Sequence, residues 1–170
     1  MVEYVTHNLF GGHLKITLPS MMRNMSDLVP IPDHQEVFQE MSQPSVGILI
    51  IEINEPTKAV NPAKFYFDEI AESNNTTAAG EMKILRPLSK SQGQLFSHEI
   101  VTGKHKSGEK EVKIRMGLLR FDEPYKTDIV VHMRSEDEES QDENWIDEFF
   151  CGWVQSVQAD DAGMRKLLGL

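Results

Sequence analysis

An almost unbroken apolar run in the first third of the chain limits the possible folds more than any other feature. Residues 46–53 read Val-Gly-Ile-Leu-Ile-Ile-Glu-Ile, which is rich in β-branched side chains and short for a helix. Strands that are buried on both faces read as continuous apolar runs of this kind. The run therefore predicts a central strand of a sheet.

Further strand-like runs follow one another along the chain. After the turn at Gly11-Gly12, residues 13–18 alternate polar and apolar side chains. Later runs cover residues 81–85, 94–102, 111–121 and 127–134. Consecutive strands with short turns between them pair antiparallel. We therefore expect an antiparallel sheet.

A first helix is predicted after the central strand. Asn61 is a suitable N-cap, and Pro62 suits the first helical position because its missing N–H would have no partner there. The helix is expected to end before Asn74. Its apolar contacts are expected to come from Phe65, Phe67 and Ile70.

Residues 20–32 show no periodic pattern of apolar side chains, which predicts a surface loop or a short helical turn.

A second, amphipathic helix is predicted over about residues 144–158. Its apolar side chains recur at spacings of four, at Trp145, Phe149, Trp153 and Val157, with Ile146, Phe150 and Val154 on the flank. We expect this stripe to pack on the sheet. The preceding residues 135–143 are almost all acidic or small and polar, which predicts a solvated, mobile segment.

These patterns together predict one α+β domain over residues 1–170, an antiparallel β-sheet flanked by helices. A chain of 170 residues can bury a core without help from disulfides or metals. The single cysteine, Cys151, excludes an internal disulfide and favours a reducing compartment. No run approaches about 18 apolar residues, and no basic start precedes an apolar run, so we expect neither a membrane span nor secretion.

The charge of the chain narrows the class of partner. There are 27 acidic residues against 17 Lys and Arg, and the formal net charge is −10. Nucleic acids and anionic membranes are bound through Lys and Arg that neutralise phosphate. We therefore expect no nucleic acid partner and no direct membrane binding, and a basic protein surface is the natural complement. We also expect a monomer without a cofactor.

Catalytic chemistry finds little support. Residues 103–110 have the glycine spacing of a phosphate-binding loop, but Glu109 occupies the position of the required lysine, so a polar hairpin loop is favoured. The histidines are scattered and there is no second cysteine, which leaves metal binding without support. Ser97 beside His98, or Asp128 with His132, would form a triad only through contacts that the sequence does not specify. A hydrolase remains open but unsupported.

The segment 28–38, Leu-Val-Pro-Ile-Pro-Asp-His-Gln-Glu-Val-Phe, combines rigidity with negative charge. Pro30 and Pro32 fix their own φ and bias the preceding residues to extended conformations. Asp33 and Glu36 are then presented with less entropy left to lose on docking. The alternative is that Asp33 caps a turn and Glu36 is a solvated acid, and the segment alone does not decide between the two.

This segment closely resembles the signature of the Mog family, the Ran guanine nucleotide release factors. In that signature Ser-Asp-Leu leads into Pro-x-Pro-Asp-x-Gln-Glu-Val-Phe, which appears here as residues 26–38. The resemblance extends in order and rough spacing over residues 9–134, through Leu9-Phe10-Gly11-Gly12, Thr102-Gly103-Lys104 and Leu118-Leu119-Arg120. The acidic segment 136–143 and the tail beyond it do not align.

The resemblance implies a Mog/PsbP-like sandwich and a non-enzymatic protein. It implies binding to the small GTPase Ran, loss of Ran's guanine nucleotide, a role in nuclear protein import, and a location in nucleus and cytoplasm. It places the Ran contacts at Asp33 and Glu36, with Asp27 as a weaker candidate and His34 and Gln35 in the same motif. The alternative is an acidic adaptor that holds a basic partner without releasing nucleotide.

Overall fold

Antiparallel pairing organises most of the chain. The computed structural model describes residues 1–41, 47–136 and 143–170, and in these residues seven strands form one sheet in the order β3-β4-β5-β9-β8-β7-β6. The strands are β3 Met22–Asn24, β4 Gln35–Glu40, β5 Ile48–Asn54, β6 Thr77–Ser89, β7 Phe96–Ser107, β8 Lys110–Phe121 and β9 Thr127–Glu136. The apolar run is β5, paired on its two sides with β4 and β9, so the prediction of a central strand is confirmed.

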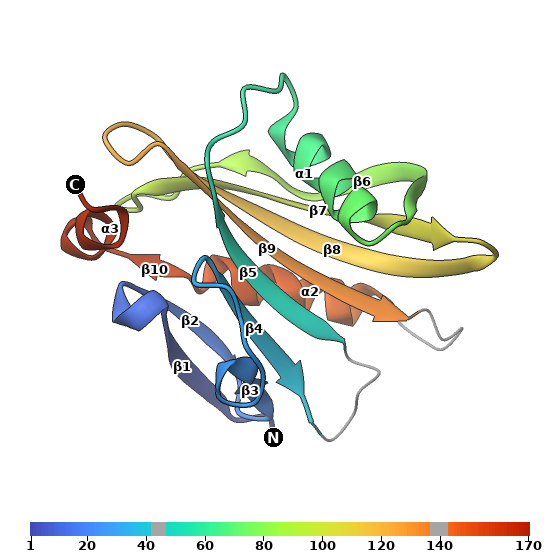
Figure 1. The fold of residues 1–170 in the computed structure, drawn as a ribbon, viewed down its shortest axis with the longest axis horizontal. Helices are drawn as coiled ribbons and strands as arrows, with labels where there is room; N and C mark the ends of the chain where they lie inside the picture. Colours follow the sequence, from blue (N-terminus) through green and yellow to red (C-terminus); the bar gives the residue numbers. More distant parts are fainter. Residues whose placement is uncertain (42–46, 137–142) are drawn as a thin grey trace.

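The remaining elements form a small second sheet, three α-helices and two 3₁₀ turns within the same described residues. The small sheet has the order β1-β2-β10, from β1 Tyr4–Leu9, β2 Leu14–Pro19 and β10 Gln158–Ala159. The helices are α1 Pro62–Ser73, α2 Glu143–Gln155 and α3 Asp161–Leu168, and the turns are η1 Phe10–Gly12 and η2 Met25–Asp27. Figure 1 shows α1 on one side of the large sheet and α2 on the other. The predicted α+β class, an antiparallel sheet flanked by helices, is confirmed.

Each face of the large sheet has its own core. On one face α1 packs against β7 and β8, and its Phe67 ring lies so close to Gly103 that a Cβ there would be 2.6 Å from the ring. On the other face the small sheet, α2 and α3 enclose the larger core, which includes Ile16, Phe38 and Phe150. Strand alternation supplies both cores, because successive side chains of a strand point to opposite faces.

The position of α1 leaves part of its own face of the sheet uncovered. The helix contacts β6, β7 and β8, but β4 and β5 extend beyond it. On β5, Leu49 and Ile51 point into the larger core, so Ile50 and Glu52 point to the side of α1. An open strip of sheet therefore runs beside the helix.

The first helix follows the prediction closely. The Asn61 side chain accepts a hydrogen bond from the Lys64 backbone N–H at 3.1 Å, and the helix ends at Ser73. Ile70 is buried, but Phe65 is exposed and does not supply the core contact expected of it.

The polar hairpin predicted at residues 103–110 is also confirmed, because β7 and β8 pair down to Ser107 and Lys110 and leave a two-residue turn between them.

The second helix exists, but its expected end and part of its expected packing face are wrong. It ends at Gln155, and the chain then enters β10 and a further helix, α3, that was not predicted. Trp145 and Phe149 are 51% and 38% exposed, whereas Trp153 and Val157 of the predicted stripe are buried, as are Phe150 and Val154 on its flank. In its first turns the helix faces the sheet with Asp147 and Phe150, and Asp147 accepts a hydrogen bond from the buried Arg115, with Oδ1 2.6 Å from Nε.

The predicted acidic segment 135–143 lies mostly outside the described residues. At its two ends the structure corrects the boundaries, since β9 continues to Glu136 and α2 begins at Glu143. In residues 20–32 the predicted short helical turn is present as η2, but Met22–Asn24 also form a short strand against β4, and Met22 is buried. That strand depends on a partner outside the segment, which local periodicity does not reveal.

Candidate functional site

In the segment 28–38, residues 28–34 form a mostly exposed turn that leads from η2 into β4, and residues 35–38 are the first part of that strand. The turn is closed by the backbone, where the Gln35 N–H donates to the Pro32 carbonyl at 2.9 Å. Asp33 is exposed at its tip, and its carboxylate makes no hydrogen bond or ion pair with any residue of the described ranges. Its side chain therefore does not cap the turn and is open to a partner.

Glu36 has a different environment from Asp33. It is half-buried and points to the face of the small sheet, as do its neighbours on alternate positions of β4. Its Oε1 accepts a hydrogen bond from the Phe10 N–H at 2.7 Å, and its Oε2 accepts one from Asn24 Nδ2 at 2.9 Å. Glu36 thus joins η1 and β3 to β4, which positions the turn that carries Asp33.

These internal bonds do not decide the predicted role of Glu36 as a Ran contact. A carboxylate has about four acceptor positions, so a cation of a partner could still reach either oxygen. The contact therefore stays a prediction. Asp27 is exposed at the end of η2, where its role is likewise untested.

His34 and Gln35 meet on the opposite face of the sheet, together with a residue that the sequence did not nominate. The Gln35 side-chain amide donates to Glu52 Oε1 at 3.1 Å, and His34 Nε2 lies 3.3 Å from the same oxygen. The strand register explains this cluster, because Gln35 of β4 is paired directly with Glu52 of β5. Only the pairing of the two strands could have pointed to Glu52.

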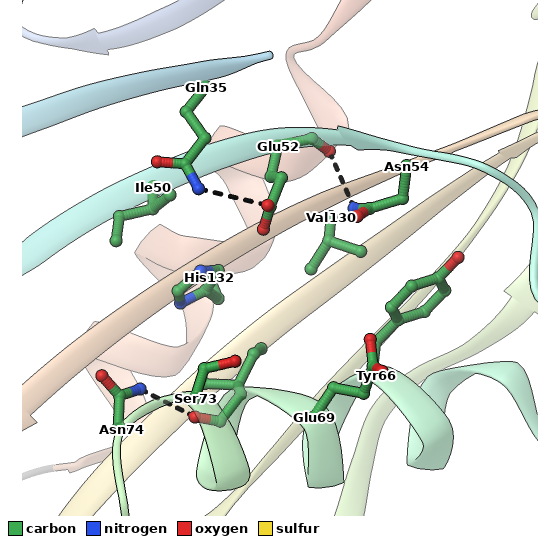
Figure 2. Close-up of a pocket in the computed structure, with 11 residues that line it drawn as sticks. Gln35, Ile50, Glu52, Asn54, Tyr66, Glu69, Ser73, Asn74, Val130 and His132 are labelled. Atoms are coloured by element: carbon green, nitrogen blue, oxygen red, sulfur yellow. Dashed lines mark hydrogen bonds between the residues drawn. The ribbon is translucent and has the colours of Figure 1, made fainter. Parts of the chain in front are cut away.

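A groove opens beside this cluster, between β5 and α1, and we call it the α1 groove (Figure 2). It has a volume of ≈ 280 Å³. The sheet contributes Gln35, Ile50, Glu52, Asn54, Val130 and His132, and α1 contributes Tyr66, Glu69, Ile70, Ser73 and Asn74. Figure 2 shows His132 between the sheet wall and the helix wall. The groove thus adjoins the side of the motif that carries Gln35.

His132 is a strongly perturbed titratable group of the groove. Its side chain belongs to β9 and is 8% exposed. Burial, with a smaller contribution from the neighbouring His105, lowers the pKa of His132 to about 4. The imidazole is therefore neutral at pH 7 and offers one acceptor and one donor nitrogen.

A buried ion pair holds α1 against the sheet at one end of the groove. Asp128 is fully buried and accepts hydrogen bonds from Arg120 Nη2 at 2.7 Å and from the Tyr66 hydroxyl at 2.8 Å. Burial, followed by the bond to Asp128, raises the pKa of Tyr66. Asp128 is thus engaged with Arg120 and Tyr66 and does not orient His132, so the triad considered from the sequence is not assembled here.

No group of three or more His, Cys, Asp and Glu in the described residues is arranged to hold a metal ion. No helix within residues 1–41, 47–136 and 143–170 is long and apolar enough to cross a bilayer.

The sequence comparisons point to a single family. Residues 7–136 match the model of the family described as Ran-interacting Mog1 protein. The chain is 28% identical over 125 residues to the Ran guanine nucleotide release factor of Danio rerio, covering 73% of this chain and 65% of that protein. It is 27% identical over 133 residues to the protein of the same name from Bos taurus, covering 72% of this chain and 71% of that one.

Solved structures with the same fold cover nearly the whole chain. The Saccharomyces cerevisiae Ran-binding protein Mog1p superposes with a TM-score of 0.70 at 15% identity, covering 96% of this chain and 99% of that one. Cyanobacterial PsbP from Synechocystis superposes with a TM-score of 0.60 at 8% identity, covering 94% of both chains. The fold is therefore Mog/PsbP-like, and with the family model matched over residues 7–136, the chain belongs to the Ran-interacting Mog1 protein family.

Proposed function

We propose that this protein binds the small GTPase Ran and promotes release of its guanine nucleotide, in support of nuclear protein import in nucleus and cytoplasm. The observation that carries the proposal is the exposed Asp33 carboxylate at the tip of a proline-stiffened turn, without an internal partner among the described residues. It stands in a chain of the Mog1 family, whose curated relatives are named Ran guanine nucleotide release factors.

The release requires binding alone. If the protein binds nucleotide-free Ran more tightly than nucleotide-bound Ran, it must weaken the affinity of Ran for nucleotide by the same factor. No bond is made or broken, and no cofactor is needed. The protein therefore acts as a non-enzymatic release factor.

The acidic side chains of the motif can account for tighter binding to nucleotide-free Ran than to nucleotide-bound Ran. We propose that Asp33, with Glu36 and Asp27 nearby in the motif, pairs with basic groups of Ran that otherwise hold the nucleotide phosphates. Such pairs compete with phosphate and favour the emptied state. His34 and Gln35 belong to the same motif but lie on the other face of the sheet, where both contact Glu52.

Asp33 gives the cleanest test because its side chain makes no hydrogen bond or ion pair among the described residues. Asp33→Lys should weaken Ran binding by about 30-fold or more, since losing one partner of a desolvated pair costs about 2–5 kcal/mol. The release of a fluorescent guanine nucleotide from Ran, followed by stopped flow against protein concentration, measures the effect. Equal release by wild type and Asp33→Lys would remove Asp33 from the contact surface.

Glu109→Lys is the matched control. Glu109 is an exposed acid in the β7–β8 turn, three strands away from β4 in the sheet order, and its change in charge is the same. It should leave release unchanged at moderate salt. The assay also separates the rival function: wild type that binds Ran but does not accelerate nucleotide release is an adaptor, not a release factor.

A further inference from the structure

The α1 groove has the chemistry to hold a positively charged side chain. We infer that it receives a lysine or arginine side chain of Ran, as a second contact beside the one proposed for Asp33. This inference rests on the Ran binding proposed above and adds to it a location and a ligand chemistry.

Two carboxylates on opposite walls attract a cation into the groove (Figure 2). Glu52 comes from β5, and its Oε2 accepts no hydrogen bond from any described residue, since Gln35 and His34 contact Oε1. Glu69 comes from α1, is exposed, and makes no ion pair in the described part of the chain. A cation between the walls would interact favourably with both, whereas an anion would be repelled by both.

His132 supplies an independent sign that a donor is missing. It is 8% exposed, lines the groove, and makes no hydrogen bond with any residue that the structure describes. Burial keeps its imidazole neutral, so one ring nitrogen is an acceptor without a donor. The ring nitrogens of His132 are not fully enclosed, so a ligand in the groove can reach the acceptor and donate to it. Ammonium and guanidinium groups carry only donors, and so match an imidazole acceptor and two carboxylates.

The apolar lining fits the stem of such a side chain. Ile50, Ile70 and Val130 line the groove between the polar groups. Lysine and arginine bury their methylene stems along apolar surface while the charged head reaches polar partners.

The charges along the groove also determine at which end a cation binds. A second hollow of ≈ 320 Å³ continues from it along β5 and shares Ile50, Ile70 and His132, but it ends at Arg134. Arg134 is paired with Ile48, while Glu52 lies four residues further along β5. A cation is thus repelled at the Arg134 end and attracted at the Glu52 end.

A pair of charge reversals on one helix tests the inference. Glu69 and Glu72 are both exposed acids of α1, but only Glu69 lines the groove. The affinity of the full chain for Ran should fall about tenfold in Glu69→Lys and change by less than about twofold in Glu72→Lys. Thermal melting of both variants checks that the fold is retained.

The outcomes separate the inference from the proposed function. A selective loss of affinity in Glu69→Lys supports the groove as a cation site. If wild type binds Ran and releases its nucleotide while Glu69→Lys and Glu72→Lys behave alike, the groove inference is overturned and the proposed function stands. If wild type does not bind Ran, both are overturned.

Discussion

Replacing Glu36 separates a positioning role from a contact role within the motif. Its carboxylate accepts hydrogen bonds from the Phe10 N–H at 2.7 Å and from Asn24 Nδ2 at 2.9 Å. Phe10 is buried, so Glu36→Ala leaves its N–H without a partner in a place that water reaches poorly. The substitution should therefore destabilise the fold as well as remove a charge.

The size of the loss follows from the two bonds. A hydrogen bond to a charged group contributes about 1.5–3 kcal/mol, and the half-buried position of Glu36 reduces this by exposure to solvent. We expect Glu36→Ala to lower the free energy of unfolding by about 2–3 kcal/mol. In a domain of this size that is a fall in Tm of roughly 5–10 °C. Asp33→Ala should change it by less than about 0.5 kcal/mol, because its exposed carboxylate makes no hydrogen bond or ion pair with any described residue.

Urea unfolding, monitored by tryptophan fluorescence, measures both variants against wild type. If Glu36→Ala unfolds at the wild-type midpoint, the two hydrogen bonds contribute nothing and the positioning role is wrong. The comparison also governs how binding data are interpreted. A loss of Ran binding in Glu36→Ala identifies a direct contact only if it exceeds what local loosening of the turn produces, whereas a loss in Asp33→Ala carries no such ambiguity.

Three further predictions concern the supports of the site. Asp147→Ala removes the counterion of Arg115, whose side chain is 1% exposed, and should cost about 3–5 kcal/mol by chemical denaturation; an unchanged midpoint would contradict the buried pair. The pKa of His132 is lowered from 6.5 to about 4 in the folded protein, so between these pH values the unfolded chain binds a proton at His132 that the folded protein does not. This difference should lower the free energy of unfolding by about 3 kcal/mol as the pH falls from 6.5 to 4. His132→Asn should flatten that part of a pH series of unfolding curves, and an equally steep series would exclude His132 as the cause. Gly117→Ala would place a Cβ 2.7 Å from Val154 Cγ1 and should lower thermal stability by about 1–3 kcal/mol, which Val154→Ala should relieve in part.

The sheet was predictable because its signal is local. The β5 run is continuously apolar, the runs of β7, β8 and β9 are each strand-like on their own, and the turns between β7, β8 and β9 are short enough to require antiparallel neighbours. The first helix was equally local, with its cap at Asn61 and a proline at the next position. By contrast, β3 pairs with β4 through only three residues, and a segment that short shows no period of its own.

The candidate site was predictable only in part, because its two halves have different origins. Asp33 belongs to a continuous motif whose charge and prolines can be read directly from the chain. The α1 groove is assembled from β4, β5, β9 and a helix, so Glu52 and Glu69 become neighbours through strand register and helix packing. His132 faces Ile50 across paired strands although more than 80 positions separate them, and no spacing rule brings such residues together.

The packing of α2 shows why counting apolar residues was insufficient. Trp153 is buried as predicted, but the first half of the helix carries two candidate stripes, one with Trp145 and Phe149, the other with Asp147 and Phe150. Periodicity favours the aromatic stripe, because an acid at the centre of the other reduces its hydrophobicity. The sheet reverses this preference because Arg115 is buried beneath the helix. Leaving its guanidinium buried without a counterion would cost more free energy than leaving two aromatic rings about half exposed. The helix therefore turns toward the sheet the stripe that contains the counterion, and the basic residue that decides its face lies on β8, 32 positions earlier in the chain.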